Sequence, residues 1–389
     1  MERIPIIPVK LGQVKGLMQA IDDELLNPAY SSDCQNIDVS DGIISTRQGS
    51  TLYVPALPAA VTAEYTICKI MKFTNSEHAA ADTDYMIVGL KQTDGAGAPA
   101  YKWFAYYSQA AAAIAWNEIT EDDYATETLR DIDPENCSWL MYILAGVPII
   151  ILTTDSKTKK IWIAEDGTDL YFVADDLGGA PTSGEFITLH RERVWMANNS
   201  AAKNTAYWCH TYDPEDWSTA GEAGNHIFYT RDNDEIIQIT NWLDDVIIIK
   251  TNTLWRVLGD ANANYEFEQI YAVQGAVYGR SACSDGAYCF FAGEDGIYQY
   301  DGTSAYPILT NEIKTVYTEF TSPRGLVANN KLYMWDRQTI TGATGYTGKC
   351  IVYDVVLKTI SVYYIGTMYD CIVSDGEVLF TNGANIYSL

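Results

Sequence analysis

The chain has 389 residues, of which 48% are hydrophobic and 28 are tyrosine, a composition typical of folded proteins built from half-buried strands and not of disordered chains. Lysine and arginine number 25 against 51 aspartate and glutamate residues, which gives a net charge of -26 with the acidic residues scattered along the chain. Because neutralising a phosphate backbone requires clustered basic side chains, this charge excludes tight binding of nucleic acid as a principal function.

Residues 1–33 differ from the rest of the chain and are predicted to form an N-terminal arm. Two prolines among the first eight residues favour an extended start. The stretch 14–25 then predicts a short helix that Asn27 and Pro28 end.

Neither export nor insertion into a membrane is expected. The first residues lack the basic and then apolar order of a signal peptide. The longest apolar stretch, 140–152, is interrupted by Gly146 and Pro148, whereas a transmembrane helix needs about 20 consecutive apolar residues.

From residue 34 onward, helical periodicity gives way to short runs rich in Val, Ile and aromatic residues, separated by turn signals. Asp-Gly steps are such signals, because glycine tolerates the positive φ that a tight hairpin turn requires. They occur at Asp41-Gly42, Asp166-Gly167, Asp285-Gly286, Asp295-Gly296, Asp301-Gly302 and Asp375-Gly376. The pattern predicts one all-β domain over residues 34–389.

Segments of roughly 40–55 residues in this domain repeat one order of features, as the blades of a propeller do. Each repeat has an apolar inner strand, a central strand rich in Val, Ile or aromatic residues, and a more polar strand that presents Tyr or Trp. Six repeats begin near Tyr65, Trp139, Glu185, Ile236, Ala282 and Gly325. We therefore predict a β-propeller of six or seven blades.

The two ends of the domain each contain part of a repeat. Residues 369–389 contain only short strands such as 378–381, and residues 34–54 contain an unpaired hairpin. We expect this hairpin to complete the last blade, which would remove an exposed sheet edge. Two stacked β-sandwiches are the alternative, but they would not explain half-repeats at both ends.

Eight cysteines are spread along the chain, mostly far apart and within apolar runs, and no Cys-x-x-Cys pair occurs. They are Cys34, Cys68, Cys137, Cys209, Cys283, Cys289, Cys350 and Cys371. A zinc site normally shows two close pairs, and a secreted disulfide scaffold is usually short and rich in cysteine. We therefore expect buried free thiols and assembly in a reducing cytoplasm.

No catalytic pattern occurs in the sequence, and we predict no catalytic residue, no metal ligand, no cofactor and no enzymatic activity. Among the four histidines, His78, His190, His210 and His226, none pairs at ligand spacing. His190 and His210 lie in or beside aromatic runs, where we expect hydrogen-bonded or surface histidines. Phosphate-binding loops, GxSxG elbows and His-Glu-x-x-His helices are absent.

Carboxylates could support two other kinds of chemistry. Some propellers are glycosidases that use two carboxylates, but the repeated Ser-x-Asp-x-Gly-x-Thr-Trp box of sialidases is absent. The acidic segments 82–84 and 232–235 could hold calcium, but neither follows the EF-hand order. We expect solvated turns at both segments, and aromatic strands that fill the spaces between blades.

Four stretches of the chain resemble β-propeller proteins of tailed-phage tails, which are called hub, nozzle or tail-stabilisation proteins in short-tailed phages. They are the opening 34–49, the strand pair that begins at 189, the hairpin 239–259 and the series of turns and strands 275–301. The ending Asp213-Pro214-Glu215-Asp216-Trp217, which follows the second stretch, is the most specific part.

The resemblance implies a structural virion component of a phage tail or head-tail connector. It implies a homo-oligomeric, symmetric ring that docks other virion proteins, such as portal, adaptor or tail components. The location implied is the virion, at the tail or the head-tail junction. Contact with passing DNA would be passive, because an acidic wall repels the polymer.

Two other functions are compatible with a propeller. A glycan-binding or glycan-cleaving propeller used in host attachment would bind a defined surface polysaccharide saturably as a monomer. A cellular scaffold of the WD-repeat kind would carry Trp-Asp strand endings at fixed repeat positions, and these are absent.

Overall fold

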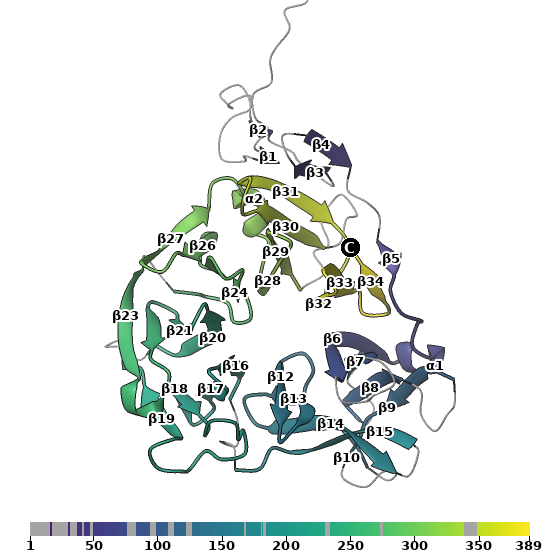
Figure 1. The fold of residues 1–389 in the computed structure, drawn as a ribbon. Helices are drawn as coiled ribbons and strands as arrows, with labels where there is room; N and C mark the ends of the chain where they lie inside the picture. The colour runs from purple at the N-terminus through teal and green to yellow at the C-terminus, as the bar shows by residue number, and fades with distance from the viewer. Residues whose placement is uncertain are drawn as a thin grey trace, which may run out of the picture.

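The computed structural model describes residues 16–17, 30–31, 37–40, 43–46 and 50–389, apart from 76–82, 94–98, 108–112, 122–126, 167–168, 180, 182–183, 230–233, 273–274 and 338–347. Strands arranged around one axis account for almost all regular structure in these residues (Figure 1). The helical elements are α1 (Ala59–Thr62), α2 (Lys314–Tyr317) and the 3-10 turn η2 (Asn262–Asn264). None of these described helices is long and apolar enough to span a membrane.

The strands form four-stranded antiparallel blades, numbered here in chain order. Blade 1 contains β6 (Tyr65–Asn75), β7 (Thr83–Gln92), β8 (Tyr101–Tyr107) and β9 (Ala115–Glu118). Blade 2 contains β12 (Ser138–Leu144), β13 (Val147–Thr153), β14 (Thr158–Asp166) and β15 (Asp169–Asp176), extended by β10 (Thr120–Glu121) and β11 (Glu127–Thr128). Blade 3 contains β16 (Phe186–His190), β17 (Arg193–Asn199), β18 (Ala202–Trp208) and β19 (Gly224–Ile227).

Blade 4 contains β20 (Ile236–Trp242), β21 (Asp245–Lys250), β22 (Leu254–Leu258) and β23 (Glu266–Ala272). Blade 5 contains β24 (Cys283–Ser284), β25 (Cys289–Ala292), β26 (Ile297–Tyr300) and β27 (Ser304–Leu309). Blade 6 contains β28 (Pro323–Ala328), β29 (Lys331–Asp336), β30 (Lys349–Asp354) and β31 (Thr359–Tyr364). Blade 7 contains β32 (Asp370–Ser374), β33 (Glu377–Thr381), β34 (Ile386–Ser388) and β5 (Thr51–Leu52).

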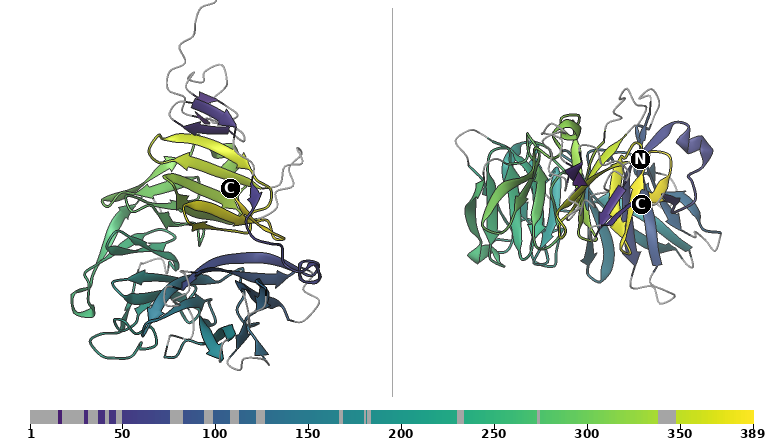
Figure 2. Two further views of the ribbon diagram at one scale, coloured as in Figure 1. Left: turned by 45° about the vertical axis from the view of Figure 1, so that its right-hand side comes forward. Right: turned by 90° about the horizontal axis from the view of Figure 1, so that it is seen from above.

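The architecture is therefore a seven-bladed β-propeller. This confirms the predicted all-β class and the higher of the two predicted blade numbers. The alternative of two stacked sandwiches is wrong, because successive blades contact one another around a ring. Their first strands meet at six junctions, and β6 meets β13 between blades 1 and 2. Seen from above, the strands run across the thickness of a disc (Figure 2).

Tight turns join strands at the Asp-Gly steps that the structure describes. Gly286 joins β24 to β25, Gly302 joins β26 to β27, and Gly376 joins β32 to β33. Their φ angles are 87°, 96° and 80°, a region that glycine alone occupies without steric cost. The predicted turn at 295–296 joins β25 to β26, but Gly296 is not among the residues with a positive φ. Residues 41–42 and 167 of the other predicted turns lie outside the described residues.

The second strand of each blade is especially apolar because it is covered on both sides. Strands β17 and β21 are buried at every residue, and β13 is buried at every residue except its first. A strand packed between two neighbouring blades has no solvent-facing side. Its sequence is therefore a continuous apolar run, as in 246–249, and does not alternate between apolar and polar residues.

Clusters of buried apolar side chains lie between successive blades, one at each of the seven junctions in the described part of the chain. Between blades 3 and 4, the rings of Trp195 and Trp208 lie 4.7 Å apart, and Tyr265 contacts both. Between blades 1 and 2, Phe73 and Phe172 meet edge to face at 5.4 Å. Aromatic residues therefore fill the spaces between blades, as predicted.

The ring closes through a strand from the N-terminal side of the chain. Strand β5 pairs antiparallel with β34, with Leu52 opposite Tyr387. The Tyr53 N–H also donates to the carbonyl of Ile386 at 2.9 Å. Blade 7 therefore combines three strands from one end of the chain with one strand from residues 34–54, and β32 contacts β6 of blade 1.

The predicted hairpin within 34–54 forms but is not the closing element. Strands β3 (Ile37–Ser40) and β4 (Ile43–Thr46) pair with each other as a separate two-stranded sheet, and β3 lies beside β31 of blade 6. The edge strand β34 has three residues, so the two residues of β5 are enough to cover it. The closing segment is therefore shorter than the predicted one.

The N-terminal arm differs from the prediction where the structure describes it. Strand β1 (Gly16–Leu17) pairs in parallel with β2 (Tyr30–Ser31) and, through Gly16, with Ile360 of β31. The helix predicted over 14–25 is therefore wrong at these two residues, and its other residues lie outside the described ones. Pairing with the outer strand of blade 6 supplies backbone hydrogen bonds without the cost of nucleating a short helix.

Candidate functional site

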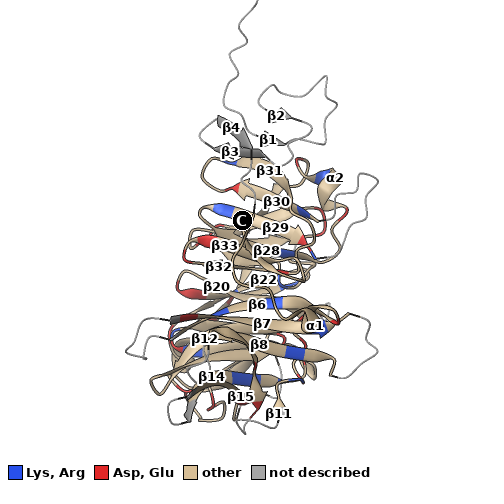
Figure 3. Ribbon diagram, turned by 90° about the vertical axis from the view of Figure 1, so that its right-hand side faces the viewer, with Lys and Arg blue, Asp and Glu red and all other residues tan. Residues whose placement is uncertain are grey.

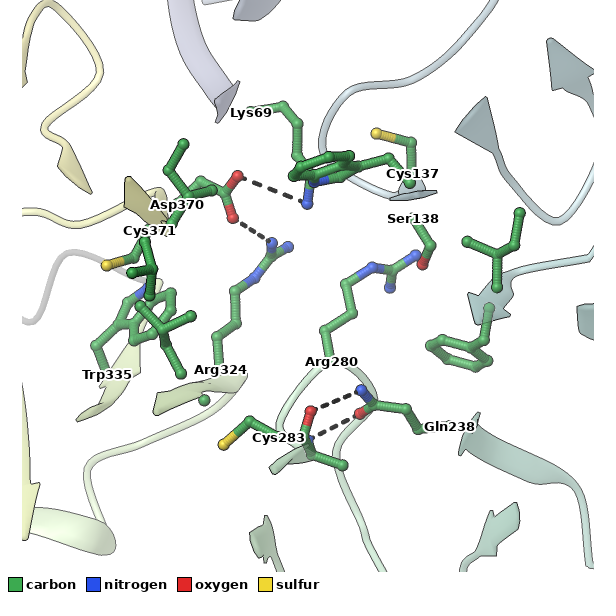
Figure 4. A pocket seen from close by; sticks show the side chains of 18 of the residues that line it. Lys69, Cys137, Ser138, Gln238, Arg280, Cys283, Arg324, Trp335, Asp370 and Cys371 are labelled. Atoms are coloured by element: carbon green, nitrogen blue, oxygen red, sulfur yellow. Dashed lines mark hydrogen bonds and ion pairs between the residues drawn. The ribbon is translucent and has the colours of Figure 1, made fainter. Parts of the chain in front are cut away.

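A cavity of about 440 Å³ lies on the propeller axis, where the first strands of the blades meet (Figure 4). Each of the seven first strands contributes to the lining through Lys69, Ser138, Ile187, Ile239, Cys283, Arg324 and Asp370. Apolar side chains, among them Trp139, Phe186 and Trp335, also line the cavity. Cavities of this size and mixed lining are typical of sites for small organic ligands.

Irregular backbone geometry accompanies two of the basic residues in the lining. The pairing of β6 with β7 has a register shift between Ile67 and Lys69, and Lys69 is buried within an otherwise apolar run. A bulge of this kind re-aims the side chain that follows it. Arg280 has a φ of 66°, in the left-handed region that non-glycine residues rarely occupy.

A single carboxylate serves two buried cations in the cavity. Asp370 Oδ2 lies 3.6 Å from Lys69 Nζ, and Asp370 Oδ1 lies 3.7 Å from Arg324 Nη1. Both distances are too long for good hydrogen bonds. Asp370 Oδ2 instead accepts the backbone N–H of Ile70 at 3.0 Å, and Arg324 Nη2 donates to the carbonyl of Glu135 at 3.0 Å.

Arg280 is held from two neighbouring segments of blades 2 and 3. Its Nη1 donates to Glu185 Oε1 at 3.0 Å, and its Nη2 donates to the carbonyl of Asn136 at 2.5 Å. Its guanidinium carbon lies 5.3 Å from the ring centroid of Phe186. These contacts offset the strain of the left-handed backbone. The buried Nε of Arg280 has no hydrogen-bond partner among the described residues.

A second cavity of about 450 Å³ shares Arg280 and Arg324 with the first and adds Arg337 and Glu135 to the lining. Arg337 forms an ion pair with Glu135. The basic residues that line the two cavities are Lys69, Lys72, Arg280, Arg324 and Arg337, and their acidic residues are Asp370 and Glu135.

The charge of Arg324 is perturbed by these surroundings. Burial lowers the pKa of Arg324 to about 10, an effect that Asp370 opposes and that the neighbouring Arg280 and Arg337 reinforce. The guanidinium is still protonated at neutral pH. The cavity therefore presents a buried cation whose charge is incompletely compensated by protein groups.

The described histidines all have structural partners. His190 Nε2 lies 3.2 Å from a backbone carbonyl oxygen, and burial lowers the pKa of this imidazole. His226 stacks on Phe267 with ring centroids 3.8 Å apart, and burial lowers its pKa as well. His210 Nδ1 lies 2.6 Å from the carbonyl oxygen of the next residue. His78 lies outside the described residues.

The described carboxylates of the two acidic segments contact protein groups. Asp234 accepts the backbone N–H groups of Thr251 and Asn252, at 3.0 and 2.9 Å. Asp84 forms an ion pair with Lys72 at 2.6 Å. Across the part of the chain that the structure describes, no group of three or more His, Cys, Asp or Glu side chains could hold a metal ion.

The segment 213–217, on which the family resemblance depends most, forms a loop between β18 and β19. Hydrogen bonds from the hydroxyl of Thr219 and from nearby backbone N–H groups lower the pKa of Asp216 to about 2. Glu215 Oε1 accepts a hydrogen bond from Lys160 Nζ at 2.6 Å, which links blade 3 to blade 2. The contacts of this loop are therefore those of a structural element that fixes two blades to each other.

Sequence reasoning did not identify the axial cavity. The available signal was a basic residue within an apolar first strand, as at Lys69, in a chain that has twice as many acidic as basic residues. That signal becomes interpretable only when the first strands are known to converge on one axis.

No family model and no curated protein sequence matches the chain. Among solved structures, two of the extracellular domain of a B. thetaiotaomicron protein, described as a one component and as a hybrid two component system, have similar folds. Both are 12% identical to this chain, with TM-scores of 0.50 and 0.51. Pyrococcus horikoshii acylaminoacyl peptidase is 10% identical, with a TM-score of 0.43 over 86% of this chain and 52% of that one.

These similarities extend to the fold alone. The match to the B. thetaiotaomicron domain covers 88% of this chain but only 40% and 39% of the two chains that it matches. Together with the seven closed blades, the likeness defines the chain as a β-propeller protein.

Proposed function

We propose that this propeller is a non-enzymatic docking component of a phage tail or head-tail connector, held in a symmetric ring of identical subunits. The family resemblance of the four stretches supports the virion location. The fold supports a docking role, because a closed disc with packed blade junctions is rigid and presents loops on two faces.

The observation that carries this proposal is the structure added outside the disc at blade 6. There β1 and β2 extend the sheet beyond β31, and the hairpin β3–β4 lies beside the same strand (Figure 1). This addition is not needed to close the ring, which β5 does. An extension at the rim is suited to contact a neighbouring subunit, and repeated heterologous contacts of this kind close into rings.

One face of the disc also offers apolar anchors. Turns between the first and second strands of the blades emerge on the same face, because every blade is an antiparallel meander of the same direction. Ile143, Leu243 and Val373 lie at or beside such turns and are 60%, 63% and 41% exposed. Exposed apolar side chains on a rigid face are available to bury apolar surface against a partner.

The distribution of charge is consistent with passive contact with DNA. Basic and acidic positions are interspersed along the side of the disc in Figure 3. The cavity on the axis of the disc has room for a small molecule and not for a duplex. DNA would therefore pass through the opening of an assembled ring, along subunits whose net charge is negative.

The test is incorporation into particles. Virions purified from host cells that carry the gene should contain the chain in several copies per particle, measured by quantitative mass spectrometry. Leu243→Asp should lower the number of copies, whereas Tyr229→Asp should leave it unchanged, because Tyr229 is 73% exposed in a loop on the opposite face. Particles without the chain would refute the proposal. Saturable binding of a host surface polysaccharide by the isolated monomer would favour a role in host attachment.

A further inference from the structure

The axial cavity and the second cavity that shares Arg280 and Arg324 with it have a charge balance opposite to that of the whole chain. Five basic side chains line them against two carboxylates, while the chain as a whole has 25 basic and 51 acidic residues. Figure 4 shows Arg280 and Arg324 extending side by side into the axial cavity, with Lys69 opposite. Burying cations is costly unless anions or hydrogen-bond acceptors compensate them.

The protein compensates these cations only in part. Asp370 is the one carboxylate in the lining of the axial cavity, and it lies beyond good hydrogen-bond distance of both Lys69 and Arg324. Glu185 balances Arg280 through Nη1, and Glu135 is engaged by Arg337 and Lys91. Lys72, at the edge of the cavity, is paired with Asp84 and Asp375.

From this geometry we infer that the axial cavity binds a small organic anion whose carboxylate or phosphate head lies between Lys69, Arg280 and Arg324. The oxygens of the anion would supply the acceptors that the protein does not, through charge-assisted hydrogen bonds donated by these three side chains. This site goes beyond the docking role and does not depend on it.

The remaining walls determine what the rest of the ligand is like. Trp139, Phe186 and Ile239 line the same cavity, so a ligand with an apolar or aromatic body gains contacts that an inorganic ion lacks. A volume of about 440 Å³ is larger than a bare phosphate requires. We therefore expect an aromatic monoanion or dianion to bind more tightly than inorganic phosphate.

Isothermal titration calorimetry on the full chain tests the site with defined probes. Phenyl phosphate and benzoate represent the two head groups, inorganic phosphate lacks the apolar body, and benzyl alcohol lacks the charge. Saturable binding at one site per chain is expected for phenyl phosphate, benzoate or both, and their order of affinity distinguishes a phosphate site from a carboxylate site. Benzyl alcohol should not bind, and inorganic phosphate should bind more weakly than the better aromatic anion.

The binding site is located with substitutions in the cavity, some expected to lower the affinity for the anion and one expected to raise it. Lys69→Met and Arg324→Gln should each lower the affinity for the aromatic anion by about ten-fold. Asp370→Asn should strengthen it, because the substitution removes the competing carboxylate and keeps an acceptor for the Ile70 N–H. Lys203→Gln is the matched control, because Lys203 is an exposed lysine with an ion-pair partner, Glu235 at 2.8 Å, and lies outside both cavities.

Thermal unfolding provides a second measurement that does not require the cation variants to be stable. A ligand that binds the folded state raises Tm. Phenyl phosphate or benzoate should therefore raise the Tm of Asp370→Asn by more than that of the wild type. The inference is overturned if no aromatic anion binds the wild type saturably, or if Asp370→Asn weakens the binding. Unchanged affinity in folded Lys69→Met and Arg324→Gln would overturn it as well.

Discussion

Free thiols are the clearest case in which single residues behave as the sequence indicates. Six of the seven cysteines that the structure describes are buried, Cys283 is partly buried, and all seven are free. Burial raises the pKa of the Cys68 and Cys137 thiols to about 11. These thiols stay protonated and unreactive at neutral pH, because the thiolate is the reactive form.

Stability should therefore decrease in alkaline solution. A thiol titrates near pH 9 when unfolded but near 11 at Cys68 and Cys137, so the unfolded state holds fewer protons between these values. Fewer bound protons in the unfolded state mean that the free energy of unfolding falls as pH rises, by roughly 2–3 kcal/mol for each thiol. Urea unfolding from about pH 8 to about 11 measures the slope. Cys68→Ala should make the slope shallower, and an equal slope would contradict this explanation.

Buried aspartates that hold loops are a second feature at this scale. Asp336, which is 1% exposed, accepts the backbone N–H groups of Thr321 and Ser322 at 2.8 and 2.9 Å. These bonds fix the segment that leads into β28. The sequence does not distinguish this aspartate from the many exposed ones.

Asp336→Ala leaves two partly buried backbone donors without acceptors and should lower the free energy of unfolding by about 2–4 kcal/mol. Asp336→Asn keeps one acceptor and should cost less. Asp354→Ala is the comparison, because Asp354 also accepts two backbone N–H groups, within the turn 354–357, but is itself only half-buried. Urea unfolding midpoints of the three variants give the order, and equal losses at Asp336 and Asp354 would contradict the role of burial.

At the scale of elements, the sequence predicts the blades well because their signals are local. Apolar second strands and Asp-Gly turns repeat with the period of a blade, and each described signal of this kind coincides with a strand or a turn. The closing strand β5 has two residues, too few for a pattern to identify it. The helix predicted over 14–25 rests on the residues expected to end it, Asn27 and Pro28, whereas strand pairing with β2 and β31 determines the conformation of Gly16–Leu17.

The closing pair can be tested by removing a single backbone donor. Tyr53→Pro eliminates the N–H that donates to the carbonyl of Ile386, and should lower the free energy of unfolding by about 1–2 kcal/mol. Tyr53→Ala keeps the donor and removes a side chain that is 39% exposed, so it controls for side-chain loss. Urea unfolding of both variants measures the difference. Equal stability would show that this bond does not contribute to closure.

The axial cavity illustrates what sequence reasoning lacks. Its lining comes from seven strands that lie far apart in the sequence. Lys69 and Asp370, for example, are separated by about 300 residues. The direction of Lys69 depends on a bulge, and that of Arg280 on a left-handed backbone, and neither is visible in an apolar pattern. Local patterns therefore predict the elements, whereas the cavity follows from their arrangement around the axis.

For the whole molecule, the blade junctions make the propeller a single rigid body. Each blade is packed on both sides through an apolar cluster, and β5 completes the ring at the seventh blade. A disc packed in this way holds the loops on its two faces in defined positions, as the proposed docking role requires. In the proposed docking role, the extension at blade 6 is the point of attachment on its rim.

Cryo-electron microscopy of particles assembled in host cells that carry the gene tests this account most directly. The account predicts density for several copies of a seven-bladed disc, arranged in a closed ring at the tail or the head-tail junction. Contact between neighbouring subunits should involve the rim at blade 6. Particles whose fully interpreted density holds no such disc would contradict the docking role.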